Sequence, residues 1–207
     1  FDEAGNSLVG QVGELVITEP MPSMPLFLWN DPTGKLLLES YFQQYDGVWR
    51  HGDWIKITER NSCVIYGRSD STLNRGGIRM GTSEFYRITG EIKEISDSMI
   101  LDTGYLNQEG ELLLFVVLDG NISLTEDLIS QIKTAIRVNL SPRYAPDMIY
   151  EVLDIPKTLN GKKLEVPVRH ILNGIPSQEV VDRDAVSNPE SLEFFVRLAG
   201  DRTANPS

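Results

Sequence analysis

Short runs of apolar and β-favouring residues, separated by polar, glycine and proline clusters, mark the first part of the chain. The runs at 11–18, 53–58 and 62–66 are typical of strands, and the polar segment Glu59-Arg60-Asn61 between the last two indicates a hairpin. Residues 36–45 favour a short helix after a turn cluster. The pattern therefore predicts a β-rich first unit.

Longer apolar runs and helical periodicity characterise the rest of the chain. Residues 95–101, 111–118 and 148–153 are predicted to be strands, and the middle one is too continuously apolar for an exposed edge. Apolar residues at helical spacing over 125–140 predict an amphipathic helix packed on that sheet. Further helices are expected to begin near Thr82, near Glu165, and behind Asn188-Pro189. The fold class is therefore α+β, with a three-stranded sheet and flanking helices in the second unit.

The apolar pattern also gives expectations about burial in the first unit. Cys63 has apolar neighbours, which favours a small buried residue over a reactive thiol. It is the only cysteine, so no internal disulfide can form, which fits a reducing compartment such as the cytoplasm. Five aromatic residues are expected in the core rather than in a ligand cage: Trp29, Tyr41, Phe42, Tyr45 and Trp49.

The composition narrows the classes of partner. Of the 207 residues, 41% are hydrophobic and 24% are charged, as in ordinary globular proteins. The formal net charge of −11 repels phosphate backbones, so neither nucleic acid nor an anionic membrane surface is expected as a partner. No segment approaches the roughly 20 apolar residues of a membrane span. His51 and His170 are isolated, so the sequence has no metal-ligand spacing.

Residues 65–81 combine glycine and arginine in an order that packing alone rarely requires. An apolar run ends in Gly67-Arg68, Asp70 follows, and Gly76-Gly77 is flanked by arginines. Glycines let backbone amides approach a ligand closely, and arginines offer forked donors to phosphate or ribose oxygens. The pattern favours a nucleotide site, although a strand, a turn and a helix start with surface charges would contain similar residues.

Three motifs, in matching order, resemble those of the adenylate-forming acyl-CoA synthetases. They are Trp49-Arg50-His51-Gly52-Asp53-Trp54, then Gly67-Arg68-Ser69-Asp70 with Asn74-x-x-Gly77-x-Arg79, and finally Pro156-Lys157-Thr158-Leu159-Asn160-Gly161-Lys162. The last is not a Walker loop, because proline and lysine stand where that motif needs glycine and a hydroxyl.

Within this superfamily, the chain is most similar to the acetoacetyl-CoA synthetase branch. The segments that carry this similarity are Pro22-Ser23-Met24-Pro25, Gly81-Thr82-x-Glu84-x-Tyr86 and Gly161-Lys162-Lys163-Leu164-Glu165-Val166. Two residues depart from the wider pattern. Asn74 replaces a lysine of many relatives, as in the acetyl and acetoacetyl branches, and His51 replaces a common threonine or serine.

The resemblance implies a ligase reaction in two steps. Acetoacetate would attack the α-phosphate of ATP, which enters with Mg²⁺, and the thiol of coenzyme A would then displace AMP. Residues 1–69 would complete the β-rich subdomain of a large adenylation domain, 70–186 would form a mobile lid, and 187–207 a C-terminal helix with a tail frayed beyond residue 200. Hinge motion of the lid would serve the two steps in turn.

Site roles follow from the same resemblance, position by position. Asp53 would accept hydrogen bonds from the ribose hydroxyls, and Arg68 would contact the nucleotide nearby; a solvent-facing acid and a salt-bridge arginine are the alternatives. Asp70 would be the hinge, although an ordinary turn residue would look the same. Lys162 would stabilise charge in the adenylation step, and its spacing after Gly161 distinguishes it from Lys157 and Lys163.

Three further residues would face coenzyme A or nucleotide phosphates. Gly77 would line the pantetheine tunnel, where a side chain would block passage. Arg79 and Arg137 match phosphate-facing positions, but Arg137 could equally lie on a solvated helix face or interact with the helix dipole.

The chain opens at Phe1 in mid-pattern, without the phosphate loop and acyl pocket of such enzymes. We therefore expect the C-terminal part of a longer ligase, inactive alone, whose partner is the remainder of its own adenylation domain. The alternatives are another short-chain acyl-CoA synthetase and a detached lid that binds without catalysis.

Overall fold

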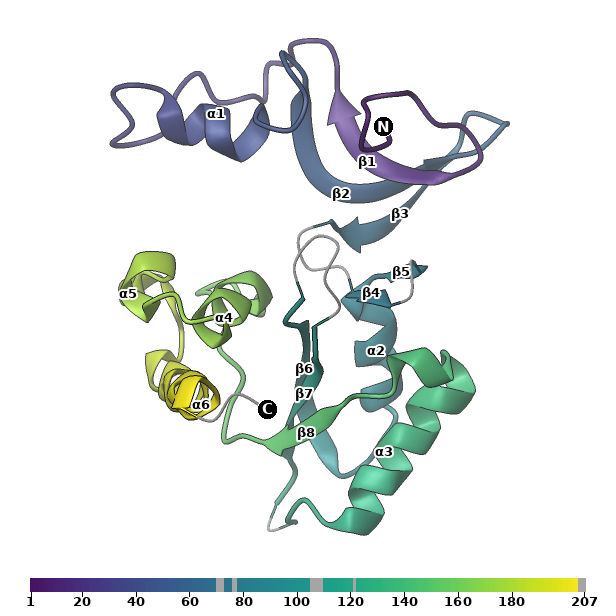
Figure 1. Cartoon of the computed structure of the whole chain (residues 1–207), viewed down its shortest axis with the longest axis vertical. Helices are drawn as coiled ribbons and strands as arrows, with labels where there is room; N and C mark the ends of the chain where they lie inside the picture. The colour runs from purple at the N-terminus through teal and green to yellow at the C-terminus, as the bar shows by residue number, and fades with distance from the viewer. Residues whose placement is uncertain (70–72, 76–77, 105–109, 121, 205–207) are drawn as a thin grey trace. The chain divides into compact units, whose positions relative to one another are not determined.

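The computed structural model describes residues 1–69, 73–75, 78–104, 110–120 and 122–204 (Figure 1). The chain divides into two compact units, Phe1–Asp70 and Ser71–Ser207. Each unit has a three-stranded sheet of its own. The α+β class expected from the sequence is confirmed.

The first unit is built on an antiparallel sheet in the order β1-β2-β3. Strand β1 spans Val12–Ile17, β2 spans Trp49–Ile57, and β3 spans Cys63–Arg68. The predicted hairpin between β2 and β3 is present, and Thr58 N donates to Ser62 O across it at 2.8 Å. Helix α1, Lys35–Tyr41, is shorter than the sequence suggested.

Two burial expectations in the first unit are wrong. Cys63 is exposed, because β3 is an edge strand whose residues are mostly open to solvent. Trp29 is 93% exposed, whereas Tyr45 and Trp49 are buried as expected. Tyr41 and Phe42 are partly buried against Trp49, and the Tyr41 and Trp49 rings stack with centroids 3.8 Å apart.

The second unit is a sheet between two layers of helices (Figure 1). Its sheet has the order β6-β7-β8, formed by Ile95–Asp102, Leu112–Leu118 and Met148–Glu151. Strand β7 is therefore central, as its apolar run predicted. It pairs antiparallel with β6 and parallel with β8. The β7–β8 connection passes through helix α3, Glu126–Asn139, as a parallel pair requires a crossover.

Alternation along the strands sends side chains into two separate cores. Ile100, Leu112, Leu114 and Val116 join one cluster with α2, Thr82–Thr89, and α3. Met99, Leu101, Leu113 and Phe115 join the other cluster with helix α4, Glu165–Leu172, and helix α6, Leu192–Ala204. Because neighbouring strand residues point to opposite faces, both faces of the sheet need a helical cover.

Several elements were not expected from the sequence. Strands β4, Leu73–Arg75, and β5, Ile78–Met80, form a two-stranded antiparallel ladder. Helix α6 extends through Ala204, so the expectation of a frayed end from residue 200 is wrong for that part. The other short elements are α5, Ser177–Val180, and the 3₁₀ turns η1, Pro142–Tyr144, η2, Arg183–Ala185, and η3, Pro189–Ser191.

Candidate functional site

Asp53 and Arg68 lie side by side in the sheet of the first unit. They are opposite each other on β2 and β3 in the antiparallel register. Gly52 has a φ of +86°, and a Cβ built on it would lie 2.9 Å from Arg68 Nη2. The left-handed backbone conformation favours glycine here, and a larger residue would also push the Arg68 guanidinium away from this backbone. The sheet presents a carboxylate and a guanidinium as neighbours.

The Asp53 carboxylate also contacts the imidazole of His51. His51 Nδ1 and Asp53 Oδ2 are joined by a short hydrogen bond. The two residues flank Gly52, where the register of the β1–β2 pair is irregular, and their side chains meet there. The Asp53 side chain is 16% exposed, so it is reachable from solvent yet held in place. His51, which departs from the wider superfamily pattern, is thus a direct partner of the candidate ribose-binding acid.

A buried carboxylate that the sequence did not single out supports the part of β2 that precedes Asp53. Glu14 on β1 is 2% exposed and accepts a hydrogen bond of 3.0 Å from the Gly52 amide. Its second oxygen lies 3.2 Å from Arg50 Nε. Arg50 Nη2 in turn donates to Ser69 Oγ at 3.0 Å. These contacts fix the backbone that carries Asp53, although local polarity in β1 gives no sign that Glu14 is buried.

The loop that carries Lys162 is a tight turn in the second unit. Lys157 and Lys163 pair as an antiparallel bridge across it. Thr158 N donates to Lys162 O at 2.8 Å, and Gly161 N donates to Thr158 O at 2.8 Å. Gly161 adopts a φ of +78°, a conformation that other residues rarely take. The turn leaves Lys162 exposed at its end.

The three lysines of this loop have different surroundings. Lys157 Nζ lies 2.6 Å from Asp97 Oδ2, and Lys163 Nζ lies 2.8 Å from Asp97 Oδ1. Lys163 Nζ also donates to Ser98 O. Within the described ranges, the Lys162 ammonium has no hydrogen bond or ion pair. The structure therefore distinguishes Lys162 from its two neighbours as the lysine available to a ligand.

The pKa values of Asp97, Lys157 and Tyr86 are shifted by their surroundings. Burial opposes ionisation of Asp97, but hydrogen bonds from Lys157 and Lys163 outweigh it and lower the pKa of the carboxyl. The hydrogen bond with Asp97 raises the pKa of Lys157 above its ordinary value.

Burial is the largest cause that raises the pKa of Tyr86 well above the usual range, and the nearby Glu165 carboxylate is the next. Tyr86 thus stays a neutral donor, and its hydroxyl donates to Glu165 Oε1.

The structure gives less information about the four remaining candidate residues. Arg137 lies in the last turn of α3 and is exposed, because α3 packs through Leu128, Ile132 and Ile136. Its solvated position is compatible with each of the roles considered for it. Arg79 lies on β5, paired with Asn74 in the backbone register. Asp70 and Gly77 lie outside the described residues.

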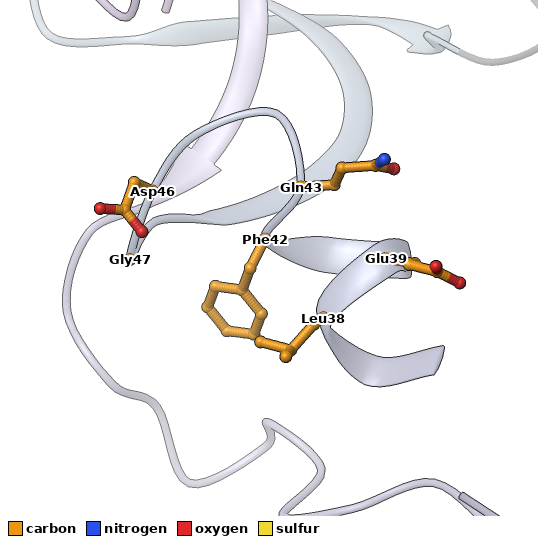
Figure 2. A pocket seen from close by; sticks show the side chains of 6 residues that line it. All are labelled: Leu38, Glu39, Phe42, Gln43, Asp46 and Gly47. Carbon is orange, nitrogen blue, oxygen red and sulfur yellow. The ribbon is translucent and has the colours of Figure 1, made fainter. Parts of the chain in front are cut away.

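None of these candidates lines either of two hollows in the described structure. One, of about 350 Å³, lies beside α1, where Leu38 and Phe42 turn toward each other while Glu39 and Gln43 point away (Figure 2). The other, of about 600 Å³, is lined by residues 177–183 and Leu192.

In the parts of the chain that the structure describes, no group of His, Cys, Asp or Glu could hold a metal ion. Nor is any described helix both long and apolar enough to cross a bilayer.

The candidate residues divide between the two units. Asp53 and Arg68 belong to the first unit, and Lys162, Arg79 and Arg137 to the second. Sequence reasoning missed Asp97, the acid shared by Lys157 and Lys163. Its only local signal is a charged residue inside a strand, between Ser96 and Ser98.

Comparison with known proteins gives matches along nearly the whole chain. No family model matches. The chain is 42% identical over 199 residues to acetoacetyl-CoA synthetase of Gallus gallus, which covers 96% of this chain and 29% of that protein. It is 40% identical over 198 residues to acetoacetyl-coenzyme A synthetase of Rhizobium meliloti (strain 1021), covering 96% and 30%. The chain thus spans about 30% of the length of these curated relatives.

A solved structure gives the same result in three dimensions. The acetoacetyl-CoA synthetase from Streptomyces lividans superposes with a TM-score of 0.85 and 46% sequence identity. The match covers 98% of this chain and 30% of that one. Both units of the fold are therefore shared with a known structure, not only the second.

Proposed function

From its homology to acetoacetyl-CoA synthetases along nearly its whole length, we propose that this chain is the C-terminal region of an ATP-dependent acetoacetate–CoA ligase. The observation that carries the proposal is the 46% identity to the Streptomyces lividans enzyme over 98% of the chain. The Lys162 ammonium, which is exposed and has no partner within the described ranges, also supports it.

The proposed reaction has two balanced steps. An acetoacetate oxygen attacks the α-phosphorus of ATP, the bond to the bridging oxygen breaks, and diphosphate leaves. The sulfur of coenzyme A then attacks the acyl carbon of the adenylate, AMP leaves, and the thiol proton is released. Negative charge builds on phosphate oxygens in the first step and on the acyl carbonyl oxygen in the second. Positioned cations and donors accelerate such steps by stabilising this charge.

Lys162 is assigned to the adenylation step. Its ammonium is exposed at the end of a tight turn, and its long side chain can reach an anionic ligand that docks on the loop. Lys157 and Lys163 are poor candidates because both ammoniums are paired with Asp97.

The first unit supplies the nucleotide contacts. The Asp53 carboxylate offers acceptors for the two ribose hydroxyls, and Arg68 provides donors beside it on the neighbouring strand. Buried Glu14 holds the Gly52 amide and thereby the backbone before Asp53.

The remaining assignments rest on sequence position. Asp70 would act as the hinge, Gly77 would line the pantetheine tunnel, and Arg79 and Arg137 would face nucleotide or coenzyme A phosphates. Magnesium would enter as the counter-ion of ATP, and the described residues offer no ligand cluster for it. The macromolecular partner is the rest of the same adenylation domain.

A chimeric enzyme tests the proposal. This chain replaces the matching 30% of the Streptomyces lividans synthetase, and acetoacetate-dependent exchange of diphosphate into ATP reports adenylation. We expect an active chimera, with Lys162→Ala lowering exchange about 100-fold or more while release of acetoacetyl-CoA from supplied acyl-adenylate changes little. Lys93→Ala, in the exposed turn after α2, is the matched control and should leave both rates unchanged.

The 207 residues alone should form no acetoacetyl-CoA. A chimera that activates propionate or butyrate but not acetoacetate would favour another short-chain ligase. Binding of ATP and coenzyme A without exchange would favour a detached lid.

A further inference from the structure

A single carboxylate from another element anchors both ends of the loop that carries Lys162. Asp97 lies on β6, some 60 residues before the loop in sequence. Its two oxygens take different lysines, Lys157 at 2.6 Å and Lys163 at 2.8 Å. Because these lysines pair across the turn, Asp97 fixes the two chain ends between which Lys162 is held.

The strand geometry directs Asp97 to this position. The register of the β6–β7 pair shifts between Ile95 and Asp97, and such irregularities change the direction in which a side chain points. The Ser98 amide donates to Asp97 Oδ1 at 2.8 Å, which restrains the carboxylate further. All three partners are partly buried, with side chains 21–31% exposed, so solvent screens these pairs less than a surface pair.

Lys163 is held by more than Asp97. Its ammonium lies 3.8 Å from the centroid of the Tyr86 ring, a cation–π contact. The Tyr86 hydroxyl donates to Glu165 Oε1, and Thr82 Oγ1 donates to the same oxygen at 3.1 Å. Helix α2 is thereby tied to the residue that begins α4, directly after the loop.

The other side of the loop pairs with residues 185–188. Lys157 N donates to Asn188 Oδ1 at 3.0 Å, and Ser187 N donates to Lys157 O at 2.9 Å. Thr158 pairs with Val186 as a second bridge. The loop is thus braced on both sides, and the ammonium of Lys162 remains unpaired among the described residues.

We propose that Asp97 is a positioning residue for Lys162. It pairs with both neighbouring ammoniums and fixes the turn, so that the Lys162 ammonium, which has no partner among the described residues, is presented at one place. The proposal rests on the proposed function for its catalytic consequence but not for its structural one. Small displacements of a catalytic group can cost about 100-fold in rate, so such bracing has a kinetic effect.

Hydrogen exchange on the 207-residue chain tests the structural part. We expect Asp97→Asn to speed exchange at the amides of Thr158 and Gly161 about tenfold or more, relative to the Leu114 amide in central β7. Glu91→Gln, which removes an exposed ion pair with Arg87, is the matched control and should leave the loop unchanged. Equal changes at the loop and at Leu114 would overturn the inference, whatever the chimera does.

The chimera tests the kinetic part. Asp97→Asn should lower kcat of diphosphate exchange about 10- to 100-fold with KM for ATP within about threefold, and Asp97→Glu should restore part of the rate. If Asp97 acts through Lys157 and Lys163, adding Lys157→Met and Lys163→Met to Asp97→Asn should not lower the kcat of exchange further. Full activity of Asp97→Asn in a chimera that needs Lys162 would refute the inference. Indifference of exchange to Lys162→Ala would instead refute the proposed function.

Discussion

At the scale of single residues, the loop at 157–163 shows how environment separates identical side chains. Lys157 and Lys163 share one carboxylate, and Lys162 has no partner in the described structure. A paired ammonium must break its ion pair before it can bind a ligand, which costs free energy. An unpaired ammonium binds a ligand without that cost. Position after Gly161 indicated Lys162 in the sequence, and the contacts of its neighbours give the physical reason.

The Asp97 cluster predicts a specific pH dependence of stability. The pKa of Asp97 is lowered in the folded chain, against about 3.9 in an unfolded one. Its contribution is therefore complete above about pH 5 and is lost as pH falls through the folded value. Melting temperatures from pH 7 to pH 3 should show wild type more stable than Asp97→Asn at pH 7, with the difference shrinking toward pH 3. A difference that stays constant with pH would contradict this assignment.

Not every residue-scale feature could be predicted from the sequence. Motif positions singled out Asp53, Arg68 and Lys162, whose roles stay predictions; in the structure Arg68 and Lys162 are exposed and Asp53 is partly exposed. The acids that support them, Glu14 and Asp97, reach their partners over 36 to 66 residues of sequence. Local periodicity contains no information about such pairs, so only the folded chain reveals them.

At the scale of elements, sequence patterns worked best where burial is periodic. Strand β7 is apolar at every position because one set of its side chains enters the α2–α3 core and the other the α4–α6 core. Helix α3 begins at Glu126 and is capped by Thr125, whose hydroxyl accepts a hydrogen bond from the Leu128 amide. The β4–β5 pair was missed because strands of three residues are too short to show alternation.

Helix α6 allows a direct test of its role in the core. Phe195 is fully buried beside Phe115, with ring centroids 4.8 Å apart, whereas the next residue, Val196, is 44% exposed. We expect Phe195→Ala to lower the free energy of unfolding by about 3–5 kcal/mol and Val196→Ala by less than about 1 kcal/mol. Urea unfolding followed by circular dichroism measures both. Similar losses for the two neighbours would mean that α6 does not pack as described.

At the scale of the whole molecule, three strongly exposed apolar residues lie close together in one segment of the first unit. Leu26 is 91% exposed, Phe27 71% and Trp29 93%. Contiguous exposed apolar side chains usually mark an interaction surface. The chain spans about 30% of the length of its relatives, and we propose that this segment packs against the rest of the adenylation domain. The error over Trp29 has the same cause, because an apolar pattern does not say which part of a protein covers it.

Tryptophan fluorescence with a complementing fragment tests this last proposal. Trp49 is 9% exposed and Trp54 is partly buried, so exposed Trp29 should dominate the red side of the emission of the isolated chain. Adding the part of the Streptomyces lividans synthetase that this chain does not match should shift the emission to the blue and restore acetoacetate-dependent exchange. Trp29→Phe should abolish most of the shift while exchange persists, because phenylalanine still fills an apolar contact. Restored exchange with an unchanged wild-type spectrum would show that Trp29 remains in water, and the surface at residues 26–29 would then need another partner.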